Sequence, residues 1–395
     1  MSRLADRRIE ISLRNRILFG VGAIDELPGL IAAAGRARAF IVTDGGVLAS
    51  GVIDRVRTVL DDARIPVGLF TEVEPNPGTS SIQRGSAALT AFGVGGTAIV
   101  PVGGGSSMDS AKVISLHAAN GGEVLALGYH RADVVPGGPV IAVPTTAGTG
   151  AETNTYGVIT DEAAGRKDYA GHPSLLPVAT ILDPALTIGL PPAATAATGV
   201  DAMTHSLESL LSANPNPFAE AMALGVIATV GAWLPRAVAD GTDLEARSQM
   251  LMASHLAGVG QASGTGVGLV HALGHAIGTR GRLAHGTALA TVLPEVLAFY
   301  LEQPGLRDRE LARVGVALRA ASTTESDASA AGAAIGAVRR LLTGVGQRPT
   351  LRSLGFDAGL LDTVAGDAID DAAIRNSPRL PSLAEARAIL GSVLG

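Results

Sequence analysis

The sequence contains no cysteine, so disulfides, thiolate nucleophiles, cysteine-ligated zinc and iron–sulfur clusters are all excluded. Aromatic residues make up only 3% of the chain, although 47% of it is hydrophobic, so the core must consist mainly of Ala, Val, Leu and Ile. Any metal in this protein must therefore bind to histidine, carboxylate or carbonyl ligands.

Long apolar runs and long runs of one charge are also missing. No stretch of about 20 apolar residues is present, and residues 1–15 lack the apolar segment of a signal peptide. The net charge of −6 is spread along the chain, which argues against a nucleic-acid or anionic-membrane surface. We therefore expect a cytoplasmic protein with a small-molecule partner, without nucleic acid or membrane as a partner.

The length of the chain predicts two domains, because 395 residues exceed the roughly 250 to 300 that one hydrophobic core supports. Short β-like runs alternate with helical stretches up to about residue 190, at 39–44, 67–72, 97–102, 140–144 and 179–183. This alternation is typical of a parallel sheet covered by helices. Beyond it, Ala- and Leu-rich segments have helical periodicity. We expect an α/β domain over 1–189 and an all-helical domain over 190–395.

A glycine triplet follows one of the predicted strands. The run at 97–102 leads into Gly103, Gly104 and Gly105, with Ser106 and Ser107 at the start of a predicted helix. Glycines let backbone N–H groups approach an anion, and a helix N-terminus adds free donors, so a pyrophosphate suits this turn. The alternative is a tight structural turn with Ser106 or Ser107 as N-cap, since the spacing matches neither common nucleotide motif.

Two other strand ends indicate the same ligand. Asp44 closes an earlier strand, where a carboxylate accepts hydrogen bonds from ribose hydroxyls and favours NAD over NADP. The run at 140–144 leads into Thr145, Thr146 and a Gly- and Thr-rich stretch at the edge where open α/β sheets bind ligands. A purely structural loop is the alternative for this stretch.

Histidines and an aspartate recur at helical spacing in the second half. Asp201 and His205 are four residues apart, His271 and His275 repeat that spacing, and His285 follows. A single histidine on an apolar helix is more often a core residue, but this combination favours a metal site. The residues alone do not decide which four bind. Three imidazoles and one carboxylate suit Fe(II), Zn(II) or Co(II), and affinity alone favours zinc.

Taken in order and spacing, residues 103–112, 144–152, 197–205 and 270–275 with His285 resemble the iron-containing (group III) alcohol dehydrogenase family. The resemblance covers nearly the whole chain. It implies a dinucleotide-binding α/β domain, a helical domain, and an active site in the cleft between them. It also implies a homo-oligomer, dimeric or larger, that moves a hydride between NAD(P) and a small alcohol or aldehyde with a divalent metal.

The resemblance also implies roles for individual residues. The metal, with Fe(II) favoured and Zn(II) as the alternative, is bound by Asp201, His205, His271 and His285. His275 lies next to the nicotinamide and substrate but off the metal, and is the candidate proton relay. The implied cofactor contacts are Asp44, Asn76, Gly103, Gly104, Gly105, Ser106, Ser107, Thr145, Thr146, Lys167 and Leu186.

Some residues depart from the family pattern or have no assigned role. The stretch 256–266, which lines the substrate pocket in relatives, usually contains an aromatic residue; here it has Gln261 and one extra residue, so the substrate is not fixed. Asp109 and Lys112 fit either a ligand or a structural role, and Arg166 is a further anion contact. Four histidines have no motif around them and are expected on the surface or in the core: His117, His130, His172 and His255.

Three other functions compete with this one. Maleylacetate reductases resemble the same family but lack the metal-binding residues, so Asp201 with its histidines argues against them. Dehydroquinate synthases are NAD- and zinc-dependent lyases on a similar frame, and the Asp-x-x-x-His pair points away from them. A non-enzymatic binding module would have no use for a combined metal and dinucleotide site.

Overall fold

The computed structural model describes residues 15–128, 131 and 133–395, so His130 lies outside the described residues. The first half of the chain forms a six-stranded parallel sheet with the strand order β1-β8-β5-β4-β2-β3. Its strands are β1 (Arg16–Phe19), β2 (Arg38–Asp44), β3 (Val67–Val73), β4 (Thr97–Gly103), β5 (Ile141–Pro144) and β8 (Ala179–Leu182). The predicted parallel sheet is confirmed.

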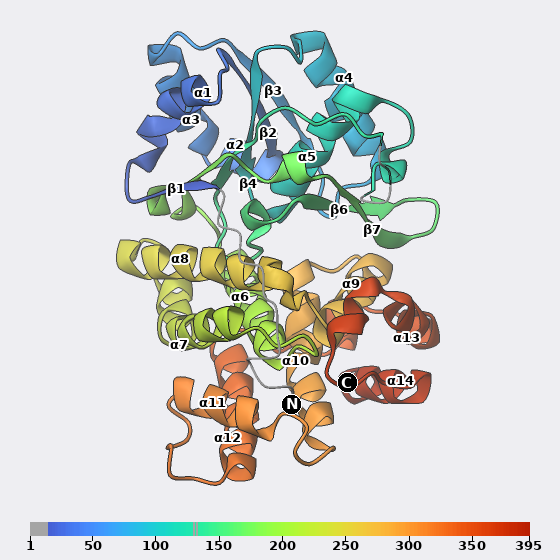
Figure 1. Ribbon diagram of the computed structural model, residues 1–395. Helices are drawn as coiled ribbons and strands as arrows, with labels where there is room; N and C mark the ends of the chain where they lie inside the picture. Colours follow the sequence, from blue (N-terminus) through green and yellow to red (C-terminus); the bar gives the residue numbers. More distant parts are fainter. Residues whose placement is uncertain (1–14, 129–130, 132) are drawn as a thin grey trace.

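Helices cover both faces of this sheet (Figure 1). Alternate residues of β2 point to opposite faces, as the two-residue period of a strand requires. Ile41 packs in one core with α1 (Leu27–Ala33) and α3 (Val52–Asp62). Phe40 and Val42 pack in another with α4 (Thr79–Phe92) and α5 (Gly105–Asn120).

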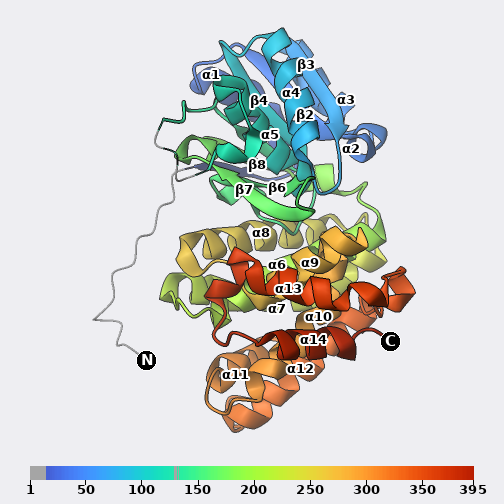
Figure 2. The ribbon, with the colours of Figure 1, turned by 90° about the vertical axis from the view of Figure 1, so that its right-hand side faces the viewer.

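Three strands were not predicted from the sequence. β1 is a short edge strand whose side chains are largely exposed. The antiparallel hairpin of β6 (Tyr156–Asp161) and β7 (Arg166–Gly171) is only partly buried and carries charged residues. In both ribbon views this hairpin lies at the boundary between the sheet and the helical half (Figures 1 and 2). It therefore forms part of the wall between the two halves.

The second half is helical and has its own large apolar core. Its helices are α6 (Pro192–Leu211), α7 (Pro217–Ala239), α8 (Leu244–Gly260), α9 (Leu269–Gly281), α10 (His285–Leu301), α11 (Asp308–Ala317), α12 (Asp327–Gly344), α13 (Leu361–Asp370) and α14 (Leu383–Ser392). The boundary expected at 189/190 falls between the end of β8 and the start of α6. Of the described helices, α7 alone is long and apolar enough to cross a membrane by length and composition, a test that core helices also pass. It packs against α6 and α8.

The direction in which successive strands are added to the sheet changes between β2 and β4. From β2 it continues to β3 on one side, and from β4 to β5 and β8 on the other. A crevice opens at such a point at the carboxyl ends of the strands, and ligands of open α/β sheets bind there. Asp44 ends β2 and Gly103 ends β4, so both lie at this crevice, on the side that faces the helical half.

Candidate metal centre and cofactor cleft

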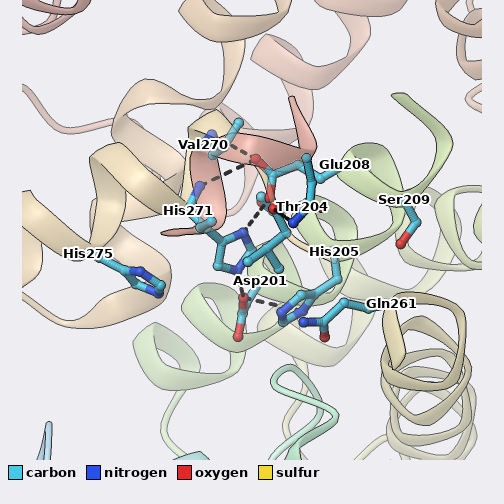
Figure 3. Close-up of polar contacts among 12 residues, drawn as sticks. Asp201, Thr204, His205, Glu208, Ser209, Gln261, Val270, His271 and His275 are labelled. Carbon is cyan, nitrogen blue, oxygen red and sulfur yellow. Dashed lines mark hydrogen bonds and ion pairs between the residues drawn. The ribbon is translucent and has the colours of Figure 1, made fainter. Parts of the chain in front are cut away.

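Asp201 lies at the centre of a buried cluster of histidines (Figure 3). Its Oδ1 is 3.5 Å from Nδ1 of His205, 3.5 Å from Nε2 of His271 and 3.7 Å from Nε2 of His285. Asp201 and His205 project from α6, whereas His271 comes from the first turn of α9 and His285 begins α10. Three helices therefore bring three imidazole nitrogens to one carboxylate oxygen.

Asp201, His271 and His285 each place one ligand atom within 4.8 Å of the other two, which fits a single bound metal ion, and His205 adds its Nδ1 at 3.5 Å from the same Asp201 oxygen. Ligand atoms about 2.1 Å from a tetrahedral ion lie roughly 3.4 Å apart, close to the distances in the cluster. Within the described part of the chain, Asp201 Oδ1, His205 Nδ1 and His271 Nε2 are buried without a hydrogen-bond partner. Buried polar atoms without partners are costly, and a shared cation would satisfy them.

Electrostatics adds to this fit at two of the three histidines. Burial is the main cause that lowers the pKa of His205, and burial together with the Lys167 ammonium lowers that of His285 well below its usual value. Both imidazoles are therefore neutral at neutral pH, which metal ligation requires.

Glu208 supports His271 from the side away from Asp201. Its Oε2 lies 2.6 Å from Nδ1 of His271, and its Oε1 accepts a hydrogen bond from the backbone N–H of Val270 at 2.7 Å. Burial opposes the charge on His271, but the Glu208 and Asp201 carboxylates outweigh burial and raise its pKa to about 9. A carboxylate on Nδ1 fixes the ring so that Nε2 faces the cluster.

His275 is held away from the cluster by a different partner. Its Nδ1 lies 2.8 Å from Oδ2 of Asp371, while its ring stacks on that of His285 with 5.4 Å between the centroids. The side chain lines two cavities, one shared with the Asp201 cluster and one bordered by Asp371 and Tyr169. His275 is therefore adjacent to the candidate metal centre, with one ring nitrogen already engaged.

The glycine turn after β4 has the features that an anion site requires. The N-cap of α5 is Gly104, which offers no side-chain cap, so the first N–H groups of the helix have no intrahelical partner. A Cβ on Gly103, whose φ is +154°, would lie 2.3 Å from Oγ of Ser107. Neither Ser106 nor Ser107 is the N-cap, because both lie inside α5 after the N-cap Gly104, and Ser107 Oγ donates to Oδ2 of Asp44 at 3.3 Å.

The other predicted cofactor residues lie along the same edge. Asp44 also caps α2 (Gly45–Ala49) by accepting from the N–H of Gly46 at 2.9 Å. The Thr145 N–H donates to the Gly103 carbonyl at 2.9 Å, and Thr146 packs against Gly104. Leu186 follows the end of β8 at this edge but differs in packing, since most of its side chain lies in the apolar core beside the sheet.

A cavity between the two halves joins the glycine turn to the histidine cluster. About 810 Å³ of empty space lies in and before it, which includes open solvent. Asn76, Gly105, Ser106 and Lys167 line it on the sheet side, and the cluster lines it on the helical side. This arrangement suits a dinucleotide whose reactive end reaches the cluster.

Asp109 lines this cavity, and Lys112 lies one turn further along α5. The Lys112 ammonium donates to Asn154 Oδ1 at 2.7 Å, to the Tyr156 carbonyl at 2.9 Å and to the Ala151 carbonyl. Burial lowers the pKa of Lys112 to about 8 and raises that of Asp109 to about 6. Lys112 therefore ties the 144–156 loop to α5, which is a structural role.

Sequence reasoning missed several residues at the site. Glu208 is seven residues after Asp201, on the same face of α6, so helical spacing alone contained a signal for it. No local pattern connects His275 with Asp371, which is 96 residues away. His255, which was expected on the surface or in the core, lies in the core, with Nδ1 3.0 Å from Oε1 of Glu152 across the two halves.

Comparisons with known proteins agree with this site. Residues 14–184 match the family model "Iron-containing alcohol dehydrogenase", and residues 195–394 match "Fe-containing alcohol dehydrogenase family, C-terminal". The chain is 35% identical to a probable alcohol dehydrogenase, EutG, of Escherichia coli, over 93% of this chain and 90% of the relative. It is 32% identical to an NAD-dependent methanol dehydrogenase of Bacillus methanolicus, over 95% and 97% of the two chains.

A solved structure of a 1,3-propanediol oxidoreductase superposes with a TM-score of 0.92 at 33% identity, covering 98% of this chain and 100% of that one. With both family models matched, the chain belongs to the iron-containing alcohol dehydrogenase family and is an oxidoreductase that transfers a hydride between a nicotinamide cofactor and an alcohol or aldehyde.

Proposed function

We propose that this enzyme binds one divalent metal through Asp201, His205, His271 and His285, with Fe(II) favoured by the family and Zn(II) as the alternative. The observation that carries this proposal is the convergence of three imidazole nitrogens, at 3.5, 3.5 and 3.7 Å, on one buried carboxylate oxygen. Maleylacetate reductases lack such a set, so the cluster favours alcohol dehydrogenation over that reaction.

The two halves of the chain have different binding roles. Residues 1–189 form the NAD(P)-binding domain and residues 190–395 the metal-binding domain. The pyrophosphate binds at the N-terminus of α5, where free N–H groups and the helix dipole favour negative charge. Asp44 receives the ribose and favours NAD over NADP, because its carboxylate repels a 2′-phosphate. The remaining cofactor contacts come from Asn76, Gly103 to Ser107, Thr145, Thr146, Lys167 and Leu186.

The chemistry needs a polarised oxygen and a route for one proton. When bound, the metal supplies Lewis acidity toward the oxygen of the alcohol or aldehyde. His275 is the catalytic residue that passes the proton: Asp371 occupies its Nδ1, which leaves Nε2 for the transfer.

Small alcohols and aldehydes are the proposed substrates, and we propose a homo-oligomer, dimeric or larger, in the cytoplasm. A panel of small alcohols, diols and aldehydes, followed by NADH absorbance with bound metal measured on the same preparation, tests the function. Asp201→Ala or His271→Ala should abolish turnover and tightly held metal but leave NAD binding nearly intact. His117→Ala, a histidine change at the far end of α5, serves as the control. Full activity of a metal-free preparation would show that the metal assignment is wrong.

A further inference from the structure

The loop between β3 and α4 lines the active cavity and has an unusual backbone. Residues 75–77 read Pro-Asn-Pro, and neither proline has a backbone N–H to donate. Asn76 has a φ of +52°, in the left-handed region that non-glycine residues rarely adopt. Asn76 and Pro77 both line the cavity. A loop with such a backbone keeps one conformation only where neighbouring elements hold it.

Thr160 on β6 holds this loop with two hydrogen bonds. Its Oγ1 donates to the carbonyl of Asn76 at 3.0 Å, and its backbone N–H donates to the carbonyl of Pro77 at 2.8 Å. Two residues further on, the Glu162 carboxylate accepts from the N–H of Ser80 at 2.8 Å, at the start of α4, where the N-cap residue offers no side-chain cap. β6 and the residue that follows it therefore hold the loop at two points.

The same hairpin brings Lys167 to the cavity. Lys167 on β7 is directly opposite Thr160 in the antiparallel register, so the two side chains lie on one face of the hairpin. Lys167 lines the cavity, and burial together with its ammonium lowers the pKa of His285. Lys167 is therefore at the end of the cavity near the histidine cluster. Thr160 is thus bonded to one proposed cofactor contact, Asn76, and paired across the hairpin with another.

The hairpin is in turn anchored on α5. The N–H of Val158 donates to Oδ2 of Asp109 at 3.1 Å, and the carbonyl of Tyr156 accepts from the Lys112 ammonium at 2.9 Å. α5 begins at the glycine turn, where the pyrophosphate is proposed to bind. Thr160 therefore fixes the 75–77 loop relative to the helix that carries the pyrophosphate site.

We propose that Thr160 is a positioning residue for the nicotinamide end of the cofactor and acts through Asn76 and Lys167. This inference rests on the proposed function, which makes these two residues cofactor contacts. Thr160 is not among the residues that line the cavity, so its effect on the cofactor is indirect. Without its hydroxyl, the Asn76 carbonyl loses a partner, and binding of NAD(H) then includes the entropic cost of ordering the loop. The contacts of the adenosine and pyrophosphate, at Asp44 and the glycine turn, would not change.

The test compares the dissociation constants of NADH and ADP for the metal-loaded holoenzyme of wild type, Thr160→Val and Thr160→Ser. ADP carries the adenosine and the pyrophosphate but no nicotinamide. Thr160→Val keeps the shape and the backbone N–H of this half-buried residue and removes only Oγ1. We expect its Kd for NADH to rise about tenfold, as for one lost hydrogen bond, and its Kd for ADP to change by less than about twofold. Thr160→Ser keeps the hydroxyl and should bind NADH nearly as tightly as wild type.

The matched control is Thr97→Val, the same substitution at the other end of β4 from Gly103, where Oγ1 donates to the carbonyl of Gly93 at 2.6 Å. It should bind NADH and ADP as wild type does. Three results would each refute the role of Thr160: an unchanged Kd for NADH in Thr160→Val, an equal rise for NADH and ADP, or a loss in Thr160→Ser as large as that in Thr160→Val. Each of them leaves the proposed function standing, because wild type still binds NADH. A wild type that binds neither NADH nor NADPH would overturn the proposed function, and this inference with it.

Discussion

Replacing Glu208 by glutamine tests the candidate metal centre without substituting any of the four proposed ligands. In wild type, Glu208 Oε2 lies 2.6 Å from Nδ1 of His271, and Oε1 accepts from the N–H of Val270 at 2.7 Å. Glu208→Gln keeps the size of the side chain but removes its negative charge and replaces one of these two oxygens by an NH₂ group. Loss of such an outer partner weakens metal binding by about 10- to 100-fold, or about 1.4 to 2.7 kcal/mol. We expect turnover at limiting metal to fall in proportion.

The assay is bound metal per chain after equilibration in a buffered series of free metal concentrations. The matched control is Glu152→Gln, the same change in another buried glutamate–histidine pair, with His255 at 3.0 Å, outside the cluster. Both variants should unfold at a lower urea concentration than wild type, but only Glu208→Gln should bind the metal more weakly. Wild-type affinity in Glu208→Gln would refute the reasoning. An equal loss in both variants would show that general loosening, rather than the support of His271, sets the affinity.

Three further predictions follow from the site. His285→Ala should lose bound metal, whereas His275→Ala should keep it and turn over slowly; a His275 variant that is purified without metal would reverse these two assignments. Asp44→Ser, which preserves the cap of α2, should shift preference toward NADP by about ten- to a hundredfold in kcat/KM, and a wild type that prefers NADPH would contradict the role of Asp44. Because burial raises the pKa of Asp109 to about 6, the folded chain binds this proton more tightly than the unfolded chain. The resulting contribution to the free energy of unfolding, at most about 3 kcal/mol, is present below about pH 4 and lost as the pH rises through about 6. Urea unfolding of Asp109→Asn should not show this loss of stability between about pH 4 and 6. An Asp109→Asn variant with the same pH dependence as wild type would disprove the prediction.

Buried and exposed strands differed in how well the sequence predicted them. β4, β5 and β8 are buried along their whole length, so their apolar runs stand out between helical stretches. β1 pairs on one side only and leaves Phe19 44% exposed, so its pattern resembles a loop. In the β6–β7 hairpin the segment Arg166 to Asp168 is charged, and tertiary contacts rather than local preference make it a strand.

At the site, spacing located the histidines but could not assign them. Four-residue spacing pairs His271 with His275 on one helical face, yet the structure turns Nε2 of His271 toward Asp201 and ties His275 to Asp371. Which partner each ring meets depends on how α9 packs against α6 and α13, and no local pattern contains that information. The resemblance to a family supplied this assignment, and it stays a prediction until metal content is measured.

The position of three site residues on α6 limits how this chain can change in length. Asp201, His205 and Glu208 keep their mutual geometry only through helical repeat, and one inserted or deleted residue between them would rotate the later side chains by about 100°. A change of length within residues 201–208 would therefore separate these three side chains. By contrast, residues Gln261–Thr265 form a turn before α9 begins at Leu269, with non-helical backbone at Ser263 and Gly264, so this turn does not depend on helical repeat. Loop grafting or insertion aimed at altering the active cavity should accordingly be made in that turn and never in α6.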